Sequence, residues 1–246
     1  MTRALLRGLA LVEAVGRRAG TVSELARRLD LDKAVVSRLV ADAEAGGWLV
    51  RRDGMVELGP RSAALGRSSD ARELERIAAE VAHALAGVTA LDITVTQFAG
   101  DRGHLLASAA GINSVLAETD VDPFPLFATA SGLTLAAGLD DADLGERLRQ
   151  PLARYTERTV TDPAEIRRRI SAIRAGGFAR EEGEFGVGVG CIAARWPHPL
   201  AAAPTSIAVL GAADHVAREE ALALRVLRAA VLPNATRSTI VAAAAG

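Results

Sequence analysis

The sequence of 246 residues has one cysteine, few aromatic residues and no long apolar run compatible with a membrane-spanning helix. The single cysteine, Cys191, excludes an internal disulfide framework and is typical of a reducing compartment, so we expect a cytoplasmic protein. Aromatic residues make up 3% of the chain, so the cores must be built from Ala, Val, Leu and Ile. The longest stretch without Asp, Glu, Lys or Arg, residues 196–213, contains three prolines that would break a spanning helix, and we expect no association with a membrane.

The charge is distributed unevenly along the chain although the net charge is only -1. Residues 1–69 contain 12 Lys and Arg against 8 Asp and Glu, whereas residues 70–246 contain 17 against 22. A basic N-terminal part on a more acidic body is typical of a DNA-binding head attached to a second domain. Solvated arginines on an ordinary surface would give the same excess.

Residues 21–48 predict two short helices joined by a tight turn. Thr21 and Glu24 have the spacing of a capping box, which predicts a helix start near Val22. Asp32 is a good N-cap for a second helix. The helical period of that second helix directs apolar residues inward, namely Val36, Leu39, Val40 and Ala43, and small or basic residues outward, namely Lys33, Ala34, Ser37, Arg38 and Ala41. A short helix, a turn and a longer helix with a basic outer face make a helix-turn-helix.

The segments on either side extend this motif to a winged helix-turn-helix over residues 1–60. Residues 3–15 predict an amphipathic helix with Leu5, Leu9 and Val12 on one face. Strands at 48–52 and 55–58 flank Asp53-Gly54, a dipeptide that favours a tight hairpin turn.

The basic residues coincide with the two elements that would contact DNA. Lys33 and Arg38 would face the major groove, while Arg51 and Arg52 would carry the hairpin toward phosphate or the minor groove. The alternative is that the hairpin arginines are merely solvated.

The remaining sequence predicts a helical linker at 61–75 and an α+β domain at 76–246 with a mixed, mostly antiparallel sheet. The periodicities predict helices at 70–85, 133–139, 163–175 and 216–231, and strands at 91–96, 104–109, 187–194 and 206–210. The strand at 91–96 alternates as a half-buried strand does, with Leu91, Ile93 and Val95 inward.

No catalytic or metal-binding constellation emerges from the reactive side chains, and we expect neither a cofactor nor an enzyme. Cys191 lies among apolar residues, where inert cysteines are common, and no sequence feature marks a base that would activate it. The four histidines show no metal-ligand spacing. The cluster of Glu181, Glu182 and Glu184 is typical of a solvated turn. The alternative is an enzyme that uses Cys191 for covalent chemistry, with the head as a dimerisation module.

Several motifs in order resemble the IclR family of bacterial transcriptional regulators. They are SELARRLDLDKAVVSRLVADAEAGGWL at 23–49, LGPR at 58–61, RYTERTVTDP at 154–163 and GVGCIAARW at 188–196. The resemblance covers nearly the whole chain. It implies a homodimer or homotetramer, a palindromic operator in double-stranded DNA, and a small-molecule effector in the C-terminal domain that alters DNA binding.

The same resemblance implies an effector pocket lined by Ala130, Ser131, Glu181, Cys191, Ala208 and Leu210. Ala208 and Leu210 stand where members that bind small carboxylic acids often have hydroxyl residues, so we expect a larger or less polar effector than a short keto acid. In the head, Ala34 and Val35 replace small hydroxyl residues, which leaves base reading to Ser37, Arg38 and apolar contacts. An effector-independent regulator with a collapsed pocket is the alternative.

Overall fold

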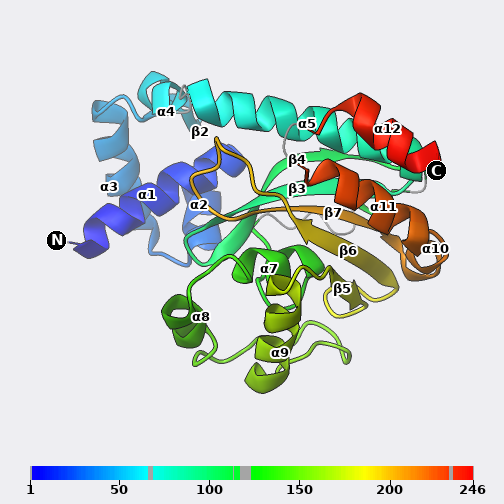
Figure 1. Ribbon diagram of the computed structural model, residues 1–246. Coiled ribbons are helices and arrows are strands. Elements are labelled where there is room, and N and C mark those ends of the chain that lie inside the picture. Colours follow the sequence, from blue (N-terminus) through cyan, green and yellow to red (C-terminus); the bar gives the residue numbers. More distant parts are fainter. Residues whose placement is uncertain (1, 66–68, 113, 117–122, 233–234, 246) are drawn as a thin grey trace. The chain divides into compact units, whose positions relative to one another are not determined.

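The computed structural model describes residues 2–65, 69–112, 114–116, 123–232 and 235–245, which form two compact units, residues 1–72 and 73–246. Figure 1 shows the helices and strands of both units. The expected linker at 61–75 contains residues 66–68, which lie outside the described residues.

The first unit is a winged helix-turn-helix, as the sequence predicts. Its elements are α1 (Thr2–Arg17), α2 (Val22–Leu29), α3 (Lys33–Ala45), β1 (Leu49–Arg52), β2 (Met55–Leu58) and α4 (Pro60–Leu65). The capping box of α2 is formed by Thr21 and Glu24. The hairpin is antiparallel and pairs Arg52 with Met55, while Asp53 and Gly54 between them adopt φ of 51° and 80°. Positive φ at both positions is what a two-residue hairpin turn requires.

The core of the first unit uses the later part of α1. Leu11 and Val15 are buried against α2, α3 and the hairpin. Leu5 and Leu9, which the sequence places on one face of this helix, are 64% and 55% exposed. The helical period alone does not distinguish a core face from a second apolar face when one helix carries both.

The second unit is built on a five-stranded sheet with the order β4-β3-β7-β6-β5. The strands are β3 (Asp92–Ala99), β4 (Arg102–Ala109), β5 (Ala179–Glu182), β6 (Val189–Arg195) and β7 (Thr205–Ala212). Every pairing in this sheet is antiparallel. The helices are α5 (Ser69–Thr89), α7 (Ala130–Ala136), α8 (Asp141–Arg147), α9 (Pro163–Arg174), α10 (Ala213–Arg218), α11 (Glu220–Ala230) and α12 (Arg237–Ala245).

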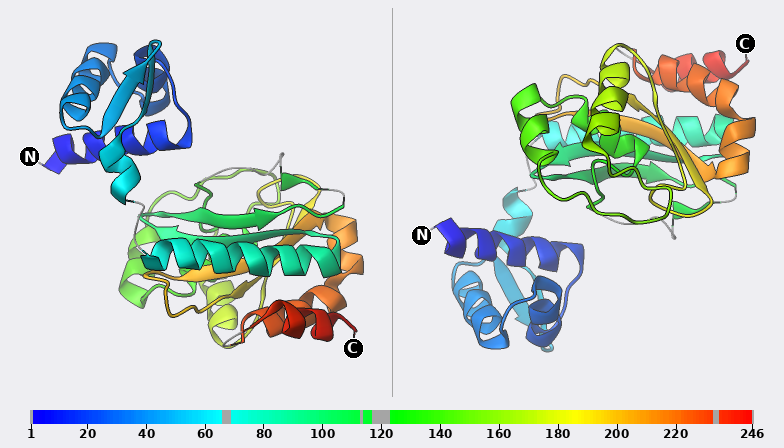
Figure 2. Two further views of the ribbon diagram at one scale, coloured as in Figure 1. Left: turned by 90° about the horizontal axis from the view of Figure 1, so that it is seen from above. Right: turned by 90° about the horizontal axis from the view of Figure 1, so that it is seen from below.

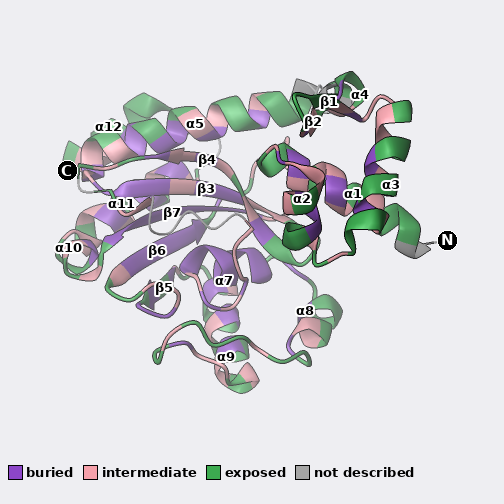
Figure 3. Ribbon diagram, turned by 180° about the vertical axis from the view of Figure 1, so that it is seen from behind, coloured by how far each residue is buried: buried purple, intermediate pink, exposed green. Residues whose placement is uncertain are grey.

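Helices cover both faces of this sheet (Figures 1 and 2). On one face α5 and α11 enclose Ile93, Val95, Ile207 and Val209. On the other face α7 and α9 form a second core. Figure 3 shows β7 and α7 coloured as buried along nearly their whole length. The strand at 92–99 is therefore not half-buried as predicted, because residues on both of its faces are covered.

Further elements differ from the sequence prediction. The helix expected at 216–231 is divided at Glu219 into α10 and α11. The glutamates expected in a solvated turn belong partly to β5, and Glu181 and Glu184 are buried. The short helix α8 and the terminal helix α12 lack a long apolar period and were not predicted. None of the described helices is long and apolar enough to cross a membrane.

Candidate DNA interface and effector site

The outer face of α3 gathers the residues predicted to read DNA. Val36 and Val40 are fully buried, whereas the opposite side presents exposed residues, namely Lys33, Ala34, Ser37, Arg38 and Ala41. The Asp32 carboxylate accepts hydrogen bonds from the backbone N–H groups of Ala34 and Val35, at 2.7 and 3.4 Å. This cap fixes the start of α3, and Val35 is half-buried beside it.

The candidate DNA-contacting arginines already have partners within the head. Arg38 Nε donates to the carbonyl oxygen of Ala34 on its own helix at 3.3 Å. On the hairpin, Arg51 pairs with Glu44 at 3.2 Å and Arg52 pairs with Glu57 at 3.7 Å. These pairs are solvent-exposed, so each stabilises the head by roughly 0–1 kcal/mol. Replacing Glu44 or Glu57 by a DNA phosphate as the partner of these arginines therefore costs little free energy.

The six residues of the expected effector pocket come together between the sheet and α7. Cys191 of β6 is paired with Glu181 on one side and with Leu210 on the other. Ala208 and Ala130 belong to the same buried cluster as Cys191 and Leu210. Ser131 and Glu181 are 6% and 7% exposed.

The start of α7 is held over the residues that pair across β5, β6 and β7, namely Glu181, Cys191 and Leu210. The Thr129 side chain caps the helix by accepting the N–H of Gly132 at 2.9 Å. A Cβ atom on Gly132 would lie 2.5 Å from the carbonyl oxygens of Pro125 and Leu126, so only glycine permits this approach of the incoming segment. The backbone N–H of Ser131 partly offsets the effect of burial on the pKa of the Cys191 thiol.

Glu181 is a buried carboxyl group with little charge compensation. Its Oε1 accepts the backbone N–H groups of Glu184 and Phe185, at 2.6 and 3.2 Å. Burial raises the pKa of Glu181 to about 7, because those two N–H groups and Arg169 only partly offset the desolvation and the nearby Glu184 carboxylate adds to it. The group is therefore divided between its acid and carboxylate forms near neutral pH.

Cys191 is an unreactive thiol in this setting. The side chain is buried, and burial together with the neighbouring Glu181 raises the pKa of the thiol far above its ordinary value. The thiolate is the nucleophilic form, so the site does not supply an activated cysteine.

Two threonines of the RYTERTVTDP segment hold the Glu181 region in place, a role that the sequence reasoning did not assign. The Thr156 hydroxyl donates to the carbonyl oxygen of Gly183 at 2.6 Å, and the Thr159 hydroxyl donates to that of Glu184 at 2.6 Å. Arg169 on α9 donates to Glu184 Oε1 at 2.7 Å. These partners are 15 to 27 residues apart in the chain, so local patterns did not reveal them.

Asp92 also belongs to this region without having been predicted. It pairs with Leu210 in the sheet register, so the row runs from Asp92 to Glu181 across four strands. Its two carboxylate oxygens accept the backbone N–H groups of Gly111 and Val115, at 2.7 and 2.6 Å. Asp92 therefore anchors the segment that follows β4.

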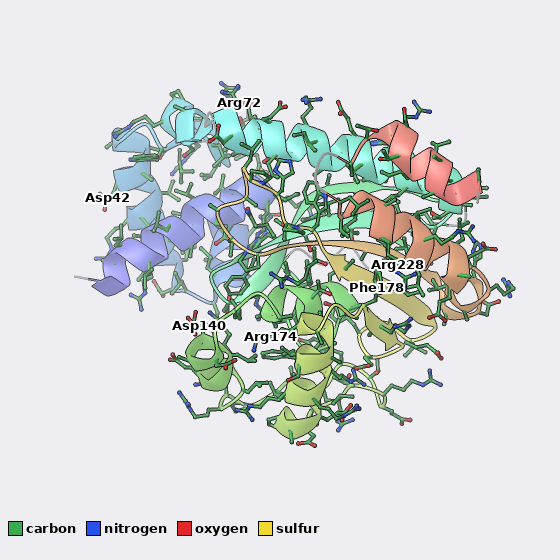
Figure 4. The ribbon with its side chains drawn as sticks, viewed as in Figure 1. Asp42, Arg72, Asp140, Arg174, Phe178 and Arg228 are labelled. Carbon is green, nitrogen blue, oxygen red and sulfur yellow. The ribbon has the colours of Figure 1, made fainter. Side chains whose placement is uncertain are left out.

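Arg174, labelled in Figure 4, connects α9 to the end of α7. Its guanidinium donates to the carbonyl oxygens of Ala137 and Leu139, at 3.0 and 2.6 Å. It also pairs with Asp141 at 2.6 Å. Within the part of the chain that the structure describes, no group of three or more His, Cys, Asp or Glu could hold a metal ion.

Comparison with known families and proteins agrees with this architecture. Residues 68–240 match the family model described as "Bacterial transcriptional regulator IclR C-terminal", and residues 8–55 match the MarR family model. The HTH-type transcriptional regulator BhcR of Paracoccus denitrificans is 29% identical over 222 residues, which are 78% of this chain and 71% of that protein.

Two solved structures are similar over nearly the whole chain. An IclR homolog from Microbacterium hydrocarbonoxydans, complexed with 4-hydroxybenzoate, has 25% identity and a TM-score of 0.70, with 92% of this chain and 99% of that chain covered. A putative IclR regulator from Silicibacter sp. TM1040 has 22% identity and a TM-score of 0.71, with 98% and 95% covered.

A winged helix-turn-helix head followed by this α+β domain defines a DNA-binding transcriptional regulator. Because the IclR C-terminal model matches most of the chain, the chain belongs to the IclR family of bacterial transcriptional regulators. The resemblance read from the sequence motifs is confirmed.

Proposed function

We propose that the protein binds a palindromic operator through α3 and the β1–β2 hairpin, as a homodimer or homotetramer. The observation that carries this proposal is the outer face of α3, where small and basic side chains are exposed while the opposite side is buried. An α-helix with such a face fits the major groove of B-DNA. The relatives named above are transcriptional regulators, which supports the same function.

The proposed division of roles separates base reading from phosphate binding. Lys33, Ser37 and Arg38 read base edges, with apolar contacts from Ala34 and Val35. Arg51 and Arg52 contact the phosphate backbone by releasing Glu44 and Glu57. Base contacts discriminate between sequences, whereas phosphate contacts strengthen binding to every sequence.

The exposed leucines of α1 support a homo-oligomer. Leu5, Leu6 and Leu9 are 64%, 59% and 55% exposed on the described helix. Neighbouring apolar side chains of this size, left in water, are typical of an interaction surface. A second copy of the head would cover them, and its two-fold symmetry would match a palindromic operator.

We further propose that a small-molecule effector occupies the region of Ala130, Ser131, Glu181, Cys191, Ala208 and Leu210. The buried Glu181 carboxyl accepts two backbone N–H groups at Oε1, and in this proposal a donor group on the ligand binds at the same carboxyl. The short side chains of Ala130 and Ala208 leave the surroundings apolar. The 4-hydroxybenzoate complex of the Microbacterium protein supports a small organic ligand in a protein of this architecture.

The proposed effector is larger or less polar than a short keto acid. Ala208 and Leu210 offer no hydroxyl groups, so a buried carboxylate would lack the hydrogen bonds that offset its desolvation. Calorimetry with glyoxylate and pyruvate tests this proposal, and tight binding of either compound overturns it. The protein needs neither cofactor nor catalytic residue for this function.

One observation favours a second version, in which no effector binds. Ala130 and Ala208 are 0% exposed, so the region is closely packed. Operator binding that no compound from a metabolite panel changes would support an effector-independent regulator with a collapsed pocket. A saturable change in operator affinity would support the effector-responsive version.

Arginine variants of the head test the DNA-binding proposal. Arg38→Ala should cost about 1–3 kcal/mol of specific binding if the side chain contacts a base bidentately. Arg51→Ala should weaken specific and random duplexes alike and reduce the slope of log affinity against log salt by about 1. Fluorescence anisotropy between low and moderate salt measures both quantities. Equal losses on both duplexes for Arg38→Ala contradict its assignment.

A further inference from the structure

The second unit contains a cavity of about 230 Å³ that lies outside the proposed effector site. Its walls come from the β3–β4 turn, residues 125–128 before α7, the end of α8 and residues 150–155. None of the six residues assigned to the effector site lines it. The cavity is therefore distinct from the proposed effector site.

Arg147, the last residue of α8, is held in a fixed position at this cavity. One guanidinium nitrogen, Nη2, donates to the carbonyl oxygen of Gly100 at 2.9 Å. The guanidinium carbon lies 5.0 Å from the centre of the Phe98 ring. A carbonyl on one nitrogen and an aromatic face beneath the group restrict its rotation, so the cation is pre-organised.

The hydrogen-bonding capacity of Arg147 is only partly used. Its Nε is buried and has no partner among the described residues. Over the same residues, no carboxylate forms an ion pair with Arg147. A partly buried guanidinium that lacks an anion leaves part of its desolvation uncompensated.

The remaining charges make the cavity electropositive. Arg102 at the β3–β4 turn is the second cation of the lining, and in the described part of the chain it has no ion-pair partner either. Asp101 is the only acidic residue among the described residues of the lining. Within that described lining, two cations against one anion favour a bound anion.

The rest of the lining is apolar and limits the size of the ligand. Phe127, Leu152 and Val160 form walls, and the Tyr155 ring is fixed by an edge-on contact with Phe185 at 5.1 Å between ring centres. The volume of about 230 Å³ lies below the range of drug-sized pockets, roughly 300–1,000 Å³. A planar guanidinium beside an apolar wall suits a carboxylate attached to a small apolar body.

We propose that this cavity binds a small organic carboxylate, with Arg147 contacting the carboxylate and Phe127, Leu152 and Val160 contacting the apolar part. The site is separate from the proposed effector site, and its occupancy does not depend on operator binding. Arg102 strengthens the attraction from the rim.

Titration of the full-length protein with benzoate, monitored by calorimetry, tests the proposal. Benzamide has nearly the same shape without the charge, and we expect it to bind at least tenfold more weakly. Arg147→Gln should weaken benzoate binding by about tenfold or more, because charge-assisted hydrogen bonds are lost. Arg147→Lys, which keeps the charge but not the planar fork, should give a smaller loss.

Arg149→Gln is the matched control, because Arg149 is exposed two residues further on and does not line the cavity. We expect it to bind benzoate within twofold of the parent protein. Three results overturn the proposal: benzoate binding does not saturate, benzoate binds no better than benzamide, or benzoate binds equally well to the Arg147→Gln and Arg149→Gln variants. Operator binding without ligand, measured on the same variants, distinguishes failure of this site from failure of the DNA-binding function.

Discussion

Replacing Glu181 by glutamine should make the stability of the second unit less dependent on pH. The carboxyl group has a pKa of about 7 in the folded protein and 4.5 as its ordinary value. Between these two pH values the folded state keeps a proton that the unfolded state has released, so the contribution of Glu181 to stability falls as pH rises. Glutamine retains an oxygen that can accept the N–H groups of Glu184 and Phe185.

The magnitude follows from the two pKa values. Integrating the linkage relation between pH 5 and pH 8 gives a loss of roughly 2–3 kcal/mol from Glu181 in the parent protein, which Glu181→Gln should remove. The free energy of unfolding can be measured by urea titration of both proteins at several pH values. The Trp48→Phe background is suitable, because fluorescence then reports only on Trp196, which is 4% exposed in the second unit.

Glu182→Gln is the matched control, since Glu182 is exposed on the opposite side of β5 and pairs with Arg158. We expect the stability difference between this variant and the parent protein to vary little over the same pH range. The difference in free energy of unfolding between Glu181→Gln and the parent protein must change with pH if Glu181 titrates in this range. A difference that stays constant within about 0.5 kcal/mol between pH 5 and pH 8 would refute the assignment of a raised pKa to Glu181.

Three further predictions concern the head and the thiol. Asp32→Ala should destabilise the head by about 0.5–2 kcal/mol through loss of the α3 cap; thermal unfolding of residues 1–72 within the full chain measures this, and an unchanged transition contradicts it. The Cys191 thiol should react slowly with a disulfide reagent in the native protein and rapidly in urea, because it is buried; equal rates contradict the assignment. Leu9→Glu should reduce the oligomer mass in light scattering at fixed concentration, because it places a charge on the exposed face of α1; an unchanged mass rules out that face as the interface.

Local signals in the sequence predicted most of the head. The capping box at Thr21, the N-cap at Asp32 and the Asp53-Gly54 turn depend on neighbouring residues, so the sequence reveals them directly. The sequence placed Leu5 and Leu9 on one apolar face of α1 but did not show whether that face meets the core, because exposed leucines have the same period as core residues. Whether an apolar face meets the core or a partner is decided by tertiary structure.

The second unit was less predictable because its site depends on distant contacts. Glu181 is buried only because α7, α9 and the 154–163 segment close over β5, so the sequence suggested a solvated turn. The resemblance assigned Glu181 and Cys191 to one pocket, and the two residues are paired in the register of β5 and β6. The Arg147 cavity combines residues from 101 to 160, which no local spacing connects.

Selection of bound duplexes from a random pool shows whether α3 reads a specific operator. We expect the parent protein to enrich one two-fold symmetric sequence. Arg38→Ala should lose preference at defined base pairs, whereas Arg51→Ala should keep the same sequence at lower affinity. Failure of the parent protein to enrich any sequence, or an identical preference in Arg38→Ala, would contradict the proposal that α3 reads a specific operator.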